Sequence, residues 1–290
     1  MSKTTIGAMF AAVLVFTALP AYAASPGEWT FLSTYVSGDY GTDTVTDTQA
    51  MTLRYTRGDK LQFRIELPFV QSEFSYGVVN TGVGPVPLGP EGEESRRQGH
   101  GGSGGPAAVL AAVTENQITR GVGDARLGIS RRLSGGGVQL HRFNAGFEVK
   151  IPTADETEGL GTGEADYRLG LAWDYRFWSA TVFAGGGWNR LGDPWWGDLN
   201  DVLDLYAGIE GDPIARQRLM LSGWFSGHQE TIDGQGNRLT AGVGLRTTGK
   251  VRWFAQVVAG LSDASPDVAA QFGLSFGFDS PGNLRWRGRQ

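Results

Sequence analysis

The residues best suited to chemistry in this 290-residue sequence are few and widely separated. The chain has no cysteine and three histidines, His100, His141 and His228. Ser226 lies two residues before His228, so on a β-strand their side chains would share one face. Nucleophilic catalysis requires a base within hydrogen-bond reach and a third group that orients the base. No acidic orienting group is evident and no Gly-x-Ser-x-Gly motif is present, so we predict no catalytic site.

The sequence also predicts no metal site and no cofactor. The lack of cysteine excludes thiol catalysis, disulfides and cysteine-ligated metals. The three histidines fall in separate segments, which argues against a histidine-ligated metal. The acidic, Gly-rich stretch 155–163 lacks the spacing of a calcium-binding EF-hand loop.

Charged residues that alternate with apolar ones form a larger candidate set. In segment 164–177 every odd-numbered residue is apolar or aromatic, and all of the charges are at even positions. Segments 61–69 and 143–151 alternate in the same way. Because successive side chains of a strand point to opposite faces, each segment has one apolar face and one polar face. The candidates for the polar, lumen-lining face are Arg64, Glu66, Asp124, Arg126, Glu148, Lys150, Asp166, Arg168, Asp174 and Arg176.

These residues must be positioned by long strands. Strands of about 9–11 residues suit a tilted crossing of a lipid bilayer, whereas soluble strands average about 5–6. Trp29, Tyr55, Trp188 and Trp253 lie toward segment ends, as in the aromatic girdles of membrane barrels. The alternative is a soluble β protein whose core these aromatics fill. Twelve strands are predicted, at 29–40, 48–57, 61–73, 121–133, 138–152, 164–177, 180–191, 201–211, 216–228, 238–247, 251–262 and 268–278.

The connections and the composition support a single all-β, antiparallel transmembrane β-barrel. Short and long connections alternate, as expected for periplasmic turns and external loops, and 74–120 is the longest. The chain has 45 glycines and 19% charged residues, and it lacks the apolar run of 18 or more residues that a membrane-spanning helix needs. A net charge of -5 gives nucleic acid no electrostatic reason to bind.

The first 23 residues predict export. Lys3 precedes an apolar stretch at 6–19 and the small-residue end Ala21-Tyr22-Ala23, which is the pattern of a cleaved signal peptide. We therefore expect a signal peptide at 1–23, a barrel at 24–278 and a periplasmic tail at 279–290. The predicted location is the outer membrane of a Gram-negative bacterium.

The last predicted strand resembles the C-terminal signal that the barrel assembly machinery reads in outer-membrane proteins. The pattern is polar-x-Gly-x-x-aromatic-x-aromatic, and Gln271, Gly273, Phe276 and Phe278 match it. Such proteins commonly end at the terminal aromatic residue, whereas this chain continues to Gln290. The expected partners are therefore this machinery, outer-membrane lipid and a small-molecule solute.

Four stretches together resemble the outer-membrane transporter family named for the MetA pathway of phenol degradation. They are LPFV at 67–70, GVGDARLGISRRL at 121–133, FEVKIPT at 147–153 and GLGTGEADYRLGLAWDYRF at 159–177. Relatives often carry a Trp after the Gly-x-Gly, where this chain has Glu164-Ala165-Asp166. The resemblance implies a channel for passive uptake of small hydrophobic or aromatic molecules.

Two further functions and the role of one loop stay open at this point. The near balance of charges on the polar face predicts ion pairs, which could border an open channel or plug a purely structural barrel. A lipid hydrolase that uses Ser226 and His228 is the catalytic alternative. The apolar run 107–113 could fold inward as a hatch, although the Gly/Ser-rich, charged composition of 74–120 favours a flexible surface loop.

Overall fold

Every regular element in the described part of the chain is a β-strand. The computed structural model describes residues 28–39, 45–57, 60–74, 78–81, 84–87, 117–135, 140–194, 197–212, 219–233, 236–248 and 251–279. The strands are β1 (Glu28–Asp39), β2 (Val45–Arg57), β3 (Leu61–Phe74), β4 (Val78–Thr81), β5 (Gly84–Pro87), β6 (Gln117–Val122), β7 (Ala125–Gly135), β8 (His141–Ile151), β9 (Asp166–Phe177), β10 (Ala180–Arg190), β11 (Val202–Gly211), β12 (Leu219–His228), β13 (Arg238–Thr247), β14 (Val251–Gly260) and β15 (Val268–Asp279). No helix within these ranges is both long and apolar enough to cross a membrane.

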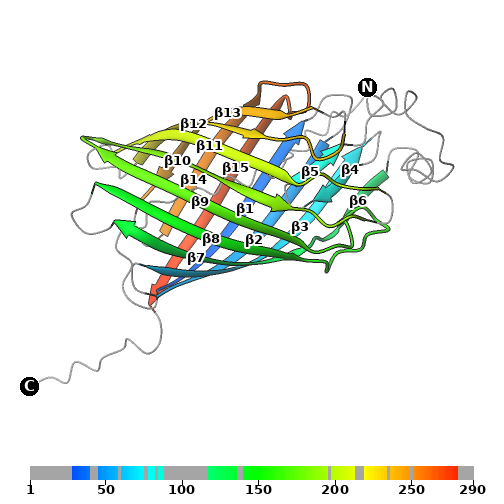
Figure 1. Cartoon of the computed structure of the whole chain (residues 1–290), viewed down its shortest axis with the longest axis horizontal. Coiled ribbons are helices and arrows are strands. Elements are labelled where there is room, and N and C mark those ends of the chain that lie inside the picture. Colours follow the sequence, from blue (N-terminus) through cyan, green and yellow to red (C-terminus); the bar gives the residue numbers. More distant parts are fainter. Residues whose placement is uncertain are drawn as a thin grey trace, which may run out of the picture.

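The strands form a closed antiparallel barrel (Figure 1). β1 pairs with β2 on one side and with β15 on the other, which joins the two ends of the sheet. Closure removes the edge strands at which an open sheet would pair with other chains. The strands of 10 or more residues are long enough to cross a bilayer at a tilt.

β6 and β7 together make one barrel strand that is interrupted at Gly123 and Asp124. β6 pairs with the second half of β3, and β7 pairs with its first half. Between them, the backbone N–H of Gly123 donates to the carbonyl of Pro68 at 2.9 Å, so β3 stays joined to both pieces. Counted as one strand, β6 and β7 bring the barrel to 12 strands, which confirms the predicted fold class.

The two ends of the barrel differ in their connections. β1 begins and β15 ends at the end that also carries the short turns, such as Trp178-Ser179 between β9 and β10. We call this the turn end, and the opposite end, which carries the longer connections, the loop end. Trp178 has a φ of 48°, as a two-residue hairpin of this kind requires at its first central position. The turn thereby presents an indole that is 87% exposed and stacks on Phe177.

The outer face is apolar over the middle of the barrel. On β9 and β13, Leu171 is 67% exposed and Val243 is 61% exposed. So many exposed apolar side chains would be unfavourable in water and are expected where a surface meets lipid. Toward the turn end the outer face carries aromatic rings, with Tyr55 4.7 Å from Trp29 and 6.5 Å from Phe63 between ring centroids.

The predicted strands agree with the observed ones to within a few residues, with three differences. The predicted strand 121–133 begins earlier, at Gln117, and is broken in the middle. β9 begins at Asp166, so Glu164 lies in the loop before it and is exposed. The predicted loop 74–120 contains a small hairpin, β4 with β5, that has its own hydrogen-bonded ladder.

Candidate functional site

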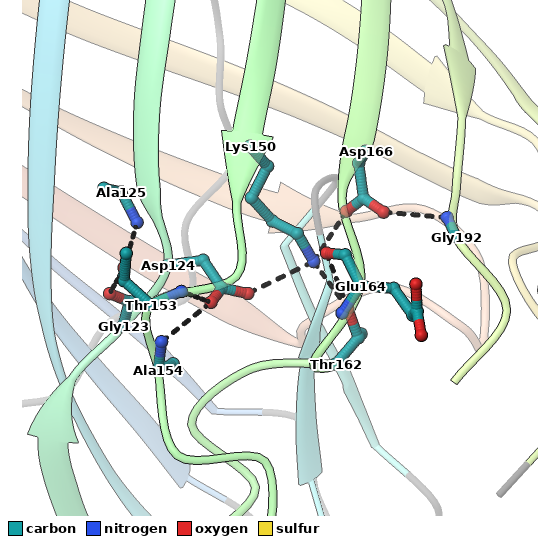
Figure 2. Close-up of polar contacts among 10 residues, drawn as sticks. All are labelled: Gly123, Asp124, Ala125, Lys150, Thr153, Ala154, Thr162, Glu164, Asp166 and Gly192. Atoms are coloured by element: carbon teal, nitrogen blue, oxygen red, sulfur yellow. Dashed lines mark hydrogen bonds and ion pairs between the residues drawn. The ribbon is translucent and has the colours of Figure 1, made fainter. Parts of the chain in front are cut away.

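A buried ion cluster lies at the loop end of the barrel (Figure 2). The Lys150 Nζ lies 3.2 Å from Asp124 Oδ2 and 2.8 Å from Asp166 Oδ2. It also donates a hydrogen bond of 2.6 Å to the Thr162 hydroxyl. The side chain of Lys150 is only 3% exposed, so its charge depends on these partners, because an unpaired buried ion costs several kcal/mol. The cluster joins the end of β8, the start of β9 and the interruption between β6 and β7.

The loop 152–165 is fixed to this cluster and reaches into the mouth of the barrel. The backbone N–H groups of Thr153 and Ala154 each donate to Asp124 Oδ1 at 3.0 Å. Leu160 is buried and covers Gly121 on the inner face of β6, where any larger side chain would collide with it. The loop therefore narrows the loop end of the lumen.

The exposed part of the same loop contains one carboxyl group, that of Asp155, whose pKa is shifted. The Thr157 hydroxyl donates to Asp155 Oδ1 at 2.6 Å and the Thr157 backbone N–H at 2.9 Å. These two bonds favour the carboxylate and lower the pKa of Asp155 below its usual value.

A charged wall lines the lumen below the cluster. Its residues lie at inward positions of β3, β7, β8 and β9, with Asp204 from β11, and most are joined by ion pairs between strands. The pairs are Arg64 with Glu148, Arg126 Nη1 with Glu66 Oε1 at 3.7 Å, Arg142 Nε with Asp174 Oδ2 at 3.0 Å, and Arg168 Nη2 with Asp204 Oδ2 at 2.5 Å. The ion pairs predicted from the charge balance are therefore present.

Nine of the ten lumen-lining candidates are thus placed together on the inner face, in the cluster or in this wall. The exception is Arg176, which lies at the turn end, where its half-exposed side chain pairs with Asp212 at 3.0 Å. Asp124 belongs to the interruption between β6 and β7 rather than to a strand.

An aromatic wall faces the charged one. It consists of the inward side chains Phe183, Tyr206, Trp224 and Phe254, from β10, β11, β12 and β14. Trp224 is 4% exposed and packs with Val258, Ala269 and Phe183. The rings of Phe183 and Tyr206 lie 6.4 Å apart between centroids. A large apolar cluster inside the barrel means that the lumen is not a uniformly polar channel.

Glycines on neighbouring strands make room for these rings. A Cβ on Gly242 would come within 2.5 Å of Cε2 of Trp224, and one on Gly208 within 2.5 Å of Cζ of Phe183. Gly273 likewise accommodates the ring of Phe254. Part of the high glycine content is therefore explained by large inward side chains that lie over a glycine of the adjacent strand.

Between the two walls, from the middle of the barrel toward the turn end, lies a cavity of about 140 Å³. Arg54, Arg64 and Arg142 border it on the charged side, Tyr206 on the aromatic side, and Gly146 and Gly170 form part of its floor. An apolar cavity of about 150 Å³ is large enough to hold benzene. The space thus has the size of one six-membered ring.

Ser226 and His228 both lie on the inner face of β12, as their spacing predicts. The Ser226 hydroxyl shares a 2.7 Å hydrogen bond with that of Thr240. Asp204 lies opposite His228 in the register, but Arg168 and Asn189 occupy its carboxylate. Within the described ranges no group of three or more His, Asp or Glu side chains is placed to hold a metal ion.

The residues of the predicted insertion signal have structural contacts in β15. Gln271 faces inward and accepts a hydrogen bond from Gln256, and Gly273 accommodates Phe254. Phe276 is exposed on the outer face, and the backbone of Phe278 pairs with Trp29. The signal peptide at 1–23, the hatch at 107–113 and the tail beyond 279 lie outside the described residues and stay predictions.

Comparison with known proteins shows the fold. No protein-family model matches the chain, and no curated protein sequence matches it. It is similar in structure to an outer membrane channel from Pseudomonas putida F1, with a TM-score of 0.61 and 14% identity over 89% of this chain and 98% of that chain. It also matches the translocator domain of the autotransporter NalP from Neisseria meningitidis, with a TM-score of 0.47 and 12% identity over 89% of this chain and 90% of that chain. The chain therefore has the fold of an outer-membrane β-barrel, and membership of the MetA-pathway family stays a prediction.

The sequence analysis missed two lumen residues that the alternation of side chains would have identified. On β7, Arg132 is an even number of residues from Arg126. On β11, Tyr206 is an even number of residues from Asp204 and Glu210. Side chains two residues apart share a face, so both belong to the lumen. Both border the cavity.

Proposed function

We propose that this protein is a channel of the Gram-negative outer membrane that admits small hydrophobic or aromatic molecules by passive diffusion. The observation that carries this proposal is the cavity of about 140 Å³ between the charged and aromatic walls of a closed barrel. The apolar outer face supports insertion into lipid, and the likeness of fold to an outer membrane channel supports the class of function. The aromatic wall supports permeants with an apolar body.

The proposal includes the route to the membrane. A signal peptide at 1–23 directs export, and the barrel assembly machinery recognises β15 through Gln271, Gly273, Phe276 and Phe278. No nucleic acid is involved, because the chain is acidic overall. Recovery of a heat-modifiable protein in the outer-membrane fraction is the expected result, and a freely dissolved periplasmic protein would contradict it.

Transport is tested by reconstitution. The purified, refolded chain is inserted into planar bilayers, and its conductance is measured together with the swelling of liposomes in solutions of single-ring solutes and of sugars. A channel gives discrete conductance steps and faster swelling with single-ring solutes. No conductance and no swelling with any solute would instead identify a structural barrel with a plugged lumen.

The structure gives less support to the lipid hydrolase alternative. Ser226 and His228 lie in the lumen, away from the outer face that meets lipid. We therefore propose that the chain is not an enzyme. Phospholipid turnover that is abolished by Ser226→Ala would refute this part of the proposal.

A further inference from the structure

We propose that the cavity is a binding site for a carboxylate attached to a single ring, with Arg54 as the residue that takes the carboxylate. This inference rests on the proposed channel function and narrows its substrate class from aromatic molecules to aromatic carboxylates. It is carried by three features: the charge of the cavity lining, the environment of Arg54, and the shape of the floor.

The lining is strongly cationic. It contains six basic residues and two acidic ones. The basic residues are Arg54, Lys60, Arg64, Arg132, Arg142 and Arg168, and the acidic residues are Glu148 and Asp174. Such an excess of one charge in a narrow space attracts a counter-ion. The whole chain is acidic, so this concentration of positive charge is local.

The acidic residues near the cavity are already engaged. Glu148 pairs with Arg64, and Asp174 pairs with Arg142 at 3.0 Å. Asp204, beyond the lining, pairs with Arg168. Neither carboxylate of the lining is therefore available to pair with another arginine of the lining.

Arg54, by contrast, forms no ion pair with a carboxylate among the described residues. Its Nε atom is buried and has no hydrogen-bond partner in the described structure. It lies directly opposite Arg64 in the pairing of β2 with β3, which places two like charges side by side. Glu66, two residues after Arg64 on the same face of β3, is shared by Arg126 and the Thr52 hydroxyl. A partly buried cation in this setting is stabilised by an anion from outside.

The floor of the cavity suits a flat ring. Gly146 and Gly170 are direct partners in the pairing of β8 with β9, so two adjacent strands expose bare backbone at the same level. A Cβ on either glycine would lie no closer than 3.5 Å to its neighbours. The glycines are thus not required by packing around them, and the space above them is open to a ligand. Tyr206 borders the same space from the aromatic wall.

The test compares benzoate with benzyl alcohol, which has a similar shape and no charge. Binding to the refolded full-length protein in detergent is measured by titration calorimetry. We expect benzoate to bind at least about tenfold more tightly than benzyl alcohol, since hydrogen bonds to charged groups have this magnitude. Arg54→Gln should weaken benzoate binding by about tenfold or more for the same reason.

Two further variants separate the site from general effects on the protein. Gly146→Val fills the floor without a clash of its Cβ and should abolish benzoate binding while the folded barrel stays heat-modifiable. Arg176→Gln removes a guanidinium at the turn end, outside the cavity, and should leave binding unchanged. Equal affinity for benzoate and benzyl alcohol, an Arg54→Gln variant that binds like the wild type, or equal loss with Arg176→Gln would each overturn the site.

Competition with acetate and chloride tests the need for a ring. If either displaces benzoate at equal concentration, the site takes any small anion and the proposed ligand is wrong. The channel function is tested separately by conductance. Benzoate binding without conductance would support the binding site and refute the channel function. Conductance without benzoate binding would support the channel function and refute the binding site.

Discussion

Lys150 provides the sharpest test of how the loop end is held. Lys150→Met keeps most of the side-chain volume and removes the ammonium that lies within 3.2 Å of Asp124 and 2.8 Å of Asp166. The two carboxylates, both nearly inaccessible to solvent, then face each other without a cation. The loop 152–165 loses the group that joins its Thr162 to the barrel.

The size of the effect follows from burial. Removing one partner of a buried ion pair typically costs about 3 to 5 kcal/mol. Asp124 keeps two backbone hydrogen bonds, and Asp166 keeps the one from the Gly192 N–H at 2.9 Å. These bonds still stabilise the carboxylates, so we expect a loss of about 3 kcal/mol, at the lower end of the range.

Two measurements check this expectation. Urea unfolding of the protein in lipid vesicles gives the change in the free energy of unfolding. Cleavage by a glutamyl endopeptidase after Glu156 or Glu158, which are exposed in the loop, reports whether the loop is released. As a control, the triple variant Lys150→Met, Asp124→Asn, Asp166→Asn removes all three charges and should recover much of the stability. A Lys150→Met variant that unfolds and resists cleavage like the wild type would refute the reasoning.

Two other predictions concern the two faces of the barrel. Gly242→Val should displace the Trp224 ring, lower the stability by about 1–3 kcal/mol and change the near-ultraviolet circular dichroism, whereas Gly223→Ala on the outer face, with 3.9 Å of room, should do neither. An unchanged Trp signal in Gly242→Val would contradict the placement of Trp224. Leu171→Arg should lower the stability in lipid vesicles by about 2–4 kcal/mol, because its side chain meets the hydrocarbon layer, and Leu171→Val should have little effect. Equal stability of the two Leu171 variants would show that this face does not contact lipid.

The barrel could be predicted from the sequence because its governing pattern is local. In 164–177 the alternation alone assigns Leu169 and Leu171 to one face and Arg168 and Asp174 to the other. The tight turns, such as Trp178-Ser179, then fix which strands are neighbours. Strand length and the alternation of side chains therefore determine most of the fold, without any knowledge of distant contacts.

The details of the lumen could not be predicted because they depend on contacts across several strands. Arg168 pairs with Asp204, 36 residues later, across the intervening strand β10. That contact is possible because Gly187 leaves space for the guanidinium. The interruption at Gly123 and Asp124 also depends on the loop 152–165, whose backbone supplies the hydrogen bonds to Asp124. Single-segment patterns contain no information about such pairings.

The central claim is that the apolar face of the barrel touches lipid while the charged face encloses the lumen. The chain lacks cysteine, so single spin labels can be attached to Leu169→Cys, Gly170→Cys, Leu171→Cys and Ala172→Cys in lipid vesicles without background. Labels at 169 and 171 should collide with oxygen dissolved in the bilayer and be shielded from an aqueous nickel chelate, with the reverse at 170 and 172. Equal access of the nickel chelate to all four positions would contradict it.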